Sequence, residues 1–158
     1  MKRKMIFVVG VLVAIAAVAV PAFAQTARGN GTLTAEGNGQ AQVRCTTCDI
    51  TISGNGVLAI LDTGETLAID INGVGTREIR ETEWGTAYIY RGFNGTATIS
   101  GEYLGVGLRG ADILLDAEGT GRVWLRGSGT YTTNGVSGEW AEDGAVVDIE
   151  AVTDDASE

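Results

Sequence analysis

Histidine is absent from this 158-residue chain, which has only two cysteines and one proline. Without histidine, Ser-His-Asp, Cys-His and His-metal mechanisms are excluded. The single proline, Pro21, leaves no proline-rich linker in the body of the chain, so we expect one domain. Enzymatic function would have to rest on carboxylates, as in glycoside hydrolases. The twenty acidic residues point to no particular pair, so we name no catalytic residue, no cofactor and no metal ligand.

Lysine is confined to the N-terminus, where Lys2, Arg3 and Lys4 precede an apolar stretch from residue 5 to 20. Pro21-Ala22-Phe23-Ala24 then offers a small-residue cleavage site, so we predict a signal peptide over 1–24. The alternative is a retained anchor, although the stretch is shorter than the roughly 20 residues of a membrane-spanning helix. We therefore expect a secreted, periplasmic or cell-surface protein that is not an integral membrane protein after cleavage.

Positive charge is scarce beyond that segment. Cleavage would leave eight arginines against twenty acidic residues, a net charge of −12. A chain this acidic is repelled by phosphate backbones and anionic lipid, so we predict no nucleic-acid partner. The expected partner is an unidentified envelope protein or a glycan. We expect residues 25–152 to form a single domain and 153–158 to form an acidic disordered tail.

Glycine pairs are abundant and separate short stretches in which apolar and polar residues alternate. Alternation with period two buries one face of a strand, and Gly-x-Gly allows the backbone to reverse, so the pattern predicts an all-β domain. The pairs are Gly29/Gly31, Gly37/Gly39, Gly54/Gly56, Gly73/Gly75, Gly105/Gly107, Gly119/Gly121 and Gly127/Gly129.

Tight hairpins through these pairs would align apolar residues. Closing the chain at Gly37-Asn38-Gly39 places Leu33 opposite Val43, and other turns place Arg109 beside Asp112 and Glu118 beside Arg122. About a dozen short strands would result, with the charged segment Thr76–Trp84 as an exposed hairpin or lip. We predict an antiparallel meander that forms a sandwich or barrel, with a short β-solenoid as the alternative. The predicted interior includes Leu33, Ile52, Leu115 and Leu125.

The glycine-punctuated strands also resemble the glycine-rich repeats of putative autotransporter-adhesin head domains (GIN-type) of secreted bacterial proteins. Those repeats tend to read Gly-Ser-Gly-Asp, whereas other residues follow the glycine pairs here. The resemblance lies in the rhythm of most of the chain and assigns no residue a role. It implies a solenoid with a surface or adhesive function.

Cys45-Thr46-Thr47-Cys48 has a spacing that suits a turn disulfide, half of a tetrahedral metal site or thiol exchange. In an exported protein we predict the disulfide. Catalytic thiol chemistry is the alternative, although Arg44 is the one adjacent cation. A metal would require ligands from a second copy, because no third cysteine is present. Asp70-Ile71-Asn72-Gly73 could also be read as a calcium loop, but it lacks the distal glutamate of an EF-hand and is by default a turn.

Aromatic residues provide the clearest indication of binding. Alternation in Arg122-Val123-Trp124-Leu125-Arg126 turns Trp124 outward, and Tyr88 and Tyr90 share one face. An exposed row of Trp124, Tyr88 and Tyr90 could stack sugars or dock a partner; alternatively, other segments cover these rings. We therefore predict a non-catalytic, exported β scaffold that serves as a binding or structural module. The alternatives are a carbohydrate-binding or carbohydrate-active protein and a small redox- or metal-linked protein.

Overall fold

A computed structural model describes residues 31–150 as an all-β, antiparallel structure, as predicted. The strands are β1 (Gly31–Asp62), β2 (Ala68–Thr82), β3 (Gly85–Thr133), β4 (Val136–Glu139) and β5 (Ala145–Ile149). They form one sheet in the order β1-β3-β2, and β4 and β5 also pair with β3. In this part of the chain, no helix has the length and hydrophobicity to cross a membrane. The predicted signal peptide and acidic tail lie outside the described residues.

Most of the molecule is one very long hairpin. β1 and β2 form the first arm, β3 forms the second, and the tip lies between Thr82 and Gly85. Pairing continues along both arms until Leu33 lies opposite Thr133. The charged segment that ends at Trp84 is therefore the end of β2 and the hairpin tip.

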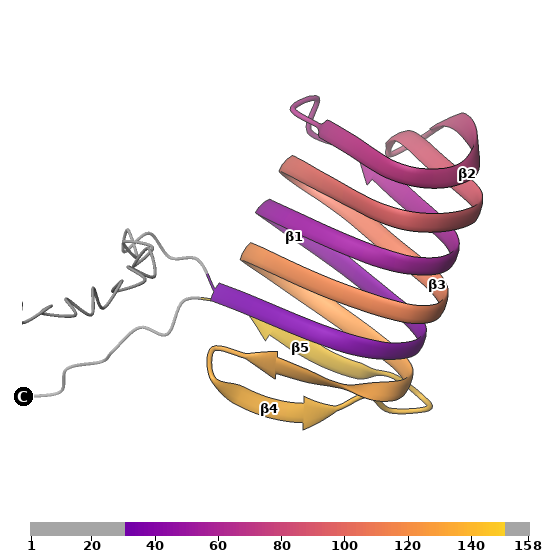
Figure 1. The fold of residues 1–158 in the computed structure, drawn as a ribbon. Helices are drawn as coiled ribbons and strands as arrows, with labels where there is room; N and C mark the ends of the chain where they lie inside the picture. Colours follow the sequence, from indigo (N-terminus) through magenta and orange to yellow (C-terminus); the bar gives the residue numbers. More distant parts are fainter. Residues whose placement is uncertain (1–30, 151–158) are drawn as a thin grey trace, which may run out of the picture.

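This hairpin is wound into a coil, so that each turn also pairs with the next. Gly39 pairs with Gly127 across the hairpin and also with Gly110 of the neighbouring turn of the coil. Gly110 and Gly127 are 17 positions apart in the sequence. Val43 pairs in the same way with Val106 and Val123. Figure 1 shows the result as a stack of U-shaped ribbons. Because the two arms run in opposite directions, every neighbouring strand segment is antiparallel.

The bent strands give the coil two walls, which we name by the charge on their outer faces. The acidic wall, in front in Figure 1, contains 31–37, 47–54, 68–73, 95–100, 113–119, 128–133 and 136–139. The arginine wall, behind it, contains 39–45, 56–62, 76–82, 85–91, 104–110, 121–127 and 145–149.

Glycines allow the chain to pass from one wall to the other. Gly39 has φ +134° and Gly127 has φ +123°, a region that L side chains rarely adopt. A Cβ at Gly39 would also overlap the carbonyl oxygen of Arg126, and one at Gly127 would overlap that of Asn38. The two glycines are paired, so the bend has no room for a side chain on either strand.

The predicted short hairpins are wrong. Gly37-Asn38-Gly39 and Gly54-Asn55-Gly56 are bends within β1, and Leu33 pairs with Ala117 and Thr133 instead of Val43. Residues 31–150 therefore form five strands, two of them very long, in place of about a dozen short ones, and their sheet does not close into a barrel. A glycine pair can serve a reversal or a bend, because both need a backbone free of side chains. Here glycines of neighbouring strands are paired, so that the strands bend together and pairing continues past them.

The core lies between the walls, and its predicted composition is confirmed. Leu33, Ile52 and Leu125 are fully buried and Leu115 is 2% exposed. Among the described residues, the buried set contains no polar or charged side chain. The alternation of the sequence thus gives the correct inner face in these segments even where the predicted pairing is wrong.

Candidate functional site

The predicted aromatic row does not form. Tyr88 pairs with Ile60 and Tyr90 with Leu58, so both tyrosines point toward the core. Tyr90 is 7% exposed and Tyr88 is partly buried against the core. Ala87 and Ile89, which alternate with the two tyrosines, lie on the outer face. This correction removes the two tyrosines from any exposed platform.

Trp124 faces outward as predicted, because its partners Gln42 and Val146 lie on the outer face of the arginine wall. Its indole is half-buried, and a Cβ at Gly144 would overlap it, so the segment before β5 lies against the ring. Trp124 and the two tyrosines are therefore on opposite faces of the sheet and cannot bind one ligand together.

A feature that the sequence analysis missed is the gathering of arginines on one face. The strand register places all but one of the seven described arginines on the outer side of the arginine wall. Arg77 is the exception, since it pairs with the inward-facing Tyr90. Those on the outer side are Arg44, Arg80, Arg91, Arg109, Arg122 and Arg126.

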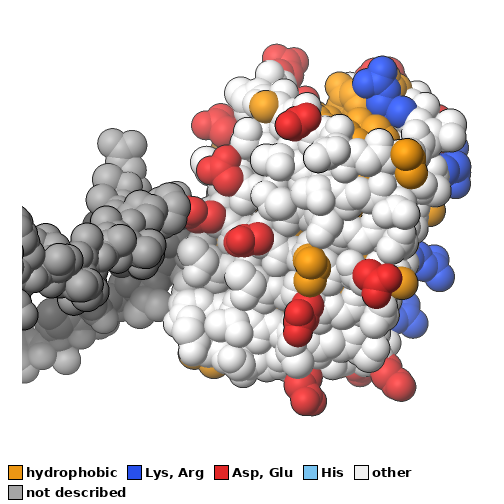
Figure 2. Space-filling model, in the orientation of Figure 1, with side chains coloured by type: hydrophobic (Ala, Val, Ile, Leu, Met, Phe, Trp, Pro, Cys, Tyr) orange, Lys and Arg blue, Asp and Glu red, His pale blue; other side chains and the backbone are white. Residues whose placement is uncertain are grey.

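The acidic wall has the opposite character. Its strands carry six exposed acids and no arginine on their outer side, among many threonines and serines. Figure 2 looks onto this wall and shows red acidic side chains on a largely white surface, with blue only at the margin. The acids are Glu36, Asp49, Asp70, Asp116, Glu118 and Glu139. Although the chain has a net negative charge, its two outer faces therefore differ in charge: arginines gather on one face and acidic residues on the other.

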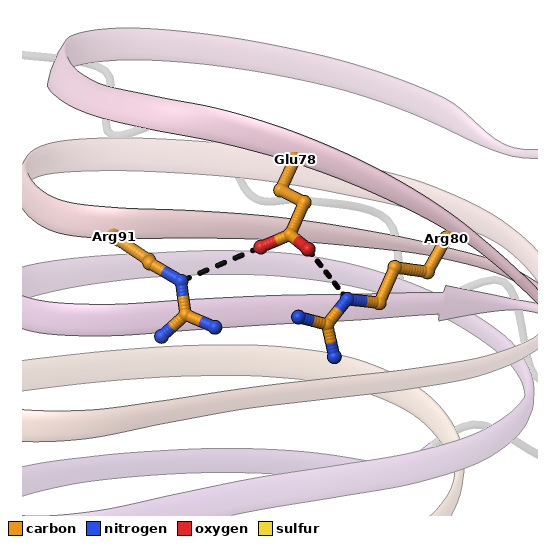
Figure 3. Close-up of polar contacts among 3 residues, drawn as sticks. All are labelled: Glu78, Arg80 and Arg91. Atoms are coloured by element: carbon orange, nitrogen blue, oxygen red, sulfur yellow. Dashed lines mark hydrogen bonds and ion pairs between the residues drawn. The ribbon is translucent and has the colours of Figure 1, made fainter.

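Two acidic side chains from strands of the arginine wall share its outer side, and arginines engage both. Glu78 lies between Arg80 and Arg91, with Nε to carboxylate distances of 2.6 and 3.4 Å (Figure 3). The hydrogen bond from Arg80, with a smaller contribution from Arg91, holds the pKa of Glu78 below its usual range. Arg122 donates to Asp148 at 2.7 Å, and this bond raises the pKa of the Arg122 guanidinium.

Arg44 and Arg109 differ from these arginines, since neither makes a side-chain hydrogen bond or ion pair within residues 31–150. Both are exposed, and both border the same groove on the outer face. Uncompensated guanidinium groups beside a groove are suited to carboxylate, sulfate or phosphate groups of a ligand.

The groove consists of two connected hollows, which together we call the arginine groove. The larger, of about 800 Å³, is bordered by Arg44, Arg122, Trp84 and Tyr103. The smaller, of about 430 Å³, extends past Gln42 to Arg109. The two share Arg44, Leu61 and Gly105, so they form one path across the wall.

Two glycines create the floor of this path. Gly105 and Gly107 have no positive φ, and a Cβ on either would meet no atom closer than 3.5 Å. Neither backbone conformation nor packing therefore requires glycine here, unlike at the bends. A glycine inside a strand often marks a place where a ligand or another backbone approaches closely.

Trp84 and Tyr103 are the exposed aromatic residues of the groove, at 69% and 58% exposure. Trp84 is at the hairpin tip. Tyr103 lies at a bend within β3, has φ +53°, and its carbonyl accepts hydrogen bonds from Thr63. Non-glycine residues with positive φ are uncommon and often belong to functional sites. The alternation of the sequence does not single out either ring, because Trp84 follows the end of β2 and Tyr103 lies at a bend next to Gly101.

Cys45 and Cys48 form the predicted disulfide, with Cα atoms 6.1 Å apart. Both cysteines are buried, at 8% and 4% exposure, and the bond joins the end of one strand segment to the start of the next. Gly121 and Gly119 are beside them, and a Cβ there would lie 2.8–2.9 Å from the cysteine Cβ atoms. Both cysteines lie within strand β1.

Asp70-Ile71-Asn72-Gly73 lies within strand β2, so it does not form the calcium loop considered above. Over residues 31–150, no three His, Cys, Asp or Glu side chains come together as a metal site. Comparison of the chain with protein-family models, with curated proteins and with solved structures found no match.

Proposed function

We propose that this protein is an exported, non-catalytic β scaffold that binds an extended acidic glycan along the arginine groove. The observation that carries the proposal is the segregation of six of the seven described arginines onto one outer face of an acidic molecule. Two of these arginines, Arg44 and Arg109, make no side-chain hydrogen bond or ion pair within residues 31–150, and they border a groove that also presents exposed aromatic rings.

The spacing of the arginines suits a polymer better than a small molecule. One row across the strands of the wall, which we call a rank, contains Arg91, Arg109 and Arg126. A single strand segment separates each of them from the next. Neighbouring strands lie about 4.8 Å apart, so these guanidinium groups recur at about 10 Å. Arg44 and Arg122 belong to a second rank four residues away along the strands, about 13 Å from the first. The smaller hollow of the groove lies between the two ranks, and the larger hollow lies beyond the second rank, toward Trp84 and Tyr103.

Aromatic and polar groups favour a sugar chain over other anions. Trp84 and Tyr103 offer flat apolar surface for the faces of sugar rings, and Gln40 and Gln42 offer amide groups that both donate and accept hydrogen bonds. The acidic wall on the opposite side repels polyanions. Binding is thereby restricted to one face and oriented.

Binding to soluble polymers tests the proposal. We expect polygalacturonate to bind and neutral dextran not to bind, with affinity that weakens as salt is raised. Arg44→Ala with Arg109→Ala should reduce affinity at least about tenfold, corresponding to about 1.4 kcal/mol. Arg77→Ala is the matched control because this arginine lies off the outer face, and it should leave affinity unchanged.

Further variants separate the groove from net charge alone. Gly107→Val should obstruct the path while conserving charge, and Trp84→Ala should remove one aromatic surface; both should weaken binding at constant salt. Equal losses in Arg77→Ala and in the double variant would reduce the effect to overall charge and contradict the proposal. Preferential binding of single-stranded DNA over polygalacturonate would also contradict it.

A further inference from the structure

The two ends of the coil differ in whether a chain segment covers the core. At the end that carries β4 and β5, Trp140 is 6% exposed and donates from Nε1 to the carbonyl of Thr130 at 3.1 Å. Its neighbour Ala141 forms a bridge with Arg126, so the segment between β4 and β5 closes over this end. The core is therefore capped on this side.

The other end of the coil is open. β2 pairs only with β3 among the described strands, and its outer backbone edge is unpaired over Ala68–Thr82. Ile69 and Ile71 are only half-buried against the core, whereas Ile79 and Val74 are 51% and 66% exposed. Coiled β proteins need capping at both ends, and a long unpaired edge is a template for another strand.

The sequence of β2 is complementary to itself in antiparallel pairing. With a two-fold axis at Gly75, Ile71 of one copy lies opposite Ile79 of the other, and Asp70 lies opposite Arg80. Each pairing occurs twice by symmetry. Ile71 and Ile79 are both on the inner side, because their β3 partners are Ala97 and Tyr88. Asp70 and Arg80 are both on the outer side, so the register joins like faces.

The two neighbouring registers that also join inner face to inner face lack this complementarity. A shift by one pairing step in one direction places Asp70 opposite Glu78, two like charges. A shift in the other direction pairs no two isoleucines and places Arg80 opposite Asn72 in place of Asp70. The register about Gly75 also sets one isoleucine, Ile69, opposite Glu81, but it keeps the isoleucine pairs and the opposite-charge pairs. Only the register about Gly75 combines two isoleucine pairs with two opposite-charge pairs, and such cross-strand pairs set strand register.

The bend of β2 is compatible with this symmetry. β2 passes from the acidic wall to the arginine wall near Gly73 and Gly75, the position of the proposed axis (Figure 1). Each half of β2 then lies beside the opposite half of its partner, so the acidic wall of each copy continues into the arginine wall of the other. Arg80 uses Nε for Glu78, which leaves its terminal nitrogens for Asp70 of the second copy.

We propose that two copies of this chain pair through β2 about a two-fold axis at Gly75, forming a continuous antiparallel sheet and closing the open end of each core. The occupant of this edge is thus a second copy. A strand from a different protein or a chain that stays single is an alternative outcome of the test.

Sedimentation of the full exported chain between 1 and 100 μM tests this pairing. We expect a dimer, and Ile79→Lys should raise its dissociation constant at least tenfold. Val136→Lys is the matched control, because Val136 is also an exposed apolar residue, at 67%, but lies at the capped end. It should leave the dimer intact. Circular dichroism establishes that each variant is folded.

Charge reversal provides the sharper test of register. Asp70→Arg or Arg80→Asp alone should weaken the dimer, and the double variant should restore it because both opposite-charge pairs are re-formed in reverse. A wild-type monomer at 100 μM would overturn the proposal. So would a dimer unaffected by Ile79→Lys, open-ended assembly that increases with concentration, or a double variant weaker than both single variants.

Discussion

The two kinds of glycine in this chain allow one substitution to be tested with opposite expected results. Gly39→Ala places a Cβ at φ +134° and against the carbonyl of Arg126. The backbone strain costs about 1–3 kcal/mol. Disturbing the ladder to Gly127 adds about 1 kcal/mol for a weakened hydrogen bond. We therefore expect a loss of about 2–4 kcal/mol in the free energy of unfolding.

Gly107→Ala is the matched comparison in the same coil. The position has no positive φ, and the nearest atom to the added Cβ would be the carbonyl oxygen of Ala41 at 3.7 Å. Alanine restricts the unfolded chain without straining the folded one, so stability should be unchanged or rise by about 0.4–1 kcal/mol. The two variants should thus differ by about 2–5 kcal/mol.

Urea denaturation followed by tryptophan fluorescence and by circular dichroism measures this difference. Coincident transitions with equal slopes would show that both variants unfold in two states and that only the midpoint has moved. If Gly39→Ala and Gly107→Ala changed stability equally, the bends would not be sites of obligatory glycine. The division of glycines into bend and groove positions would then be refuted.

Three further measurements address other parts of the molecule. Trp140→Ala should lower the free energy of unfolding by about 3–5 kcal/mol by uncapping one end of the core, with Trp140→Phe losing less, as urea denaturation would show. Replacing Cys45 and Cys48 together with alanine should cost about 2 kcal/mol, since the disulfide closes a very short loop, and native protein should give no reaction in a thiol assay. Carboxyl-carbon NMR should find Glu78 titrating below the usual glutamate range and moving up in Arg80→Ala. The small stabilisation from its ion pairs is present above the unfolded-state pKa and should fade as pH falls through the lower folded-state pKa.

Alternation by itself decided the class of the fold and much of the core. Leu33, Ile52, Leu115 and Leu125 are buried because period-two patterning gives each strand one apolar face whatever its neighbours are. Alternation could not decide which side chains of Ala87-Tyr88-Ile89-Tyr90 face the core, because both faces of this segment are apolar. The neighbours Leu58 and Ile60 turn the two tyrosines inward, and those neighbours come from a distant part of the chain.

A signal of the coil was nevertheless present in the sequence. Gly39, Gly56 and Gly73 recur every 17 residues, and Arg91, Arg109 and Arg126 recur after 18 and then 17. When the glycine pairs are interpreted as turns between strands of eight or nine residues, they indicate hairpins. When the same glycines are interpreted as the bends of a coil with 17 residues per turn, the three arginines fall at equivalent positions of successive turns and therefore in one rank.

Local sequence thus determined that strands form, where they bend and which residues become buried, because backbone freedom and burial depend on each residue and its nearest neighbours. Only the tertiary structure decided which strands pair, since short hairpins and one wound hairpin bury the same side chains. It also decided the charge polarity and the groove. These join arginines and aromatic rings from turns of the coil that are distant in sequence, and only the register of the long strands brings them onto one face.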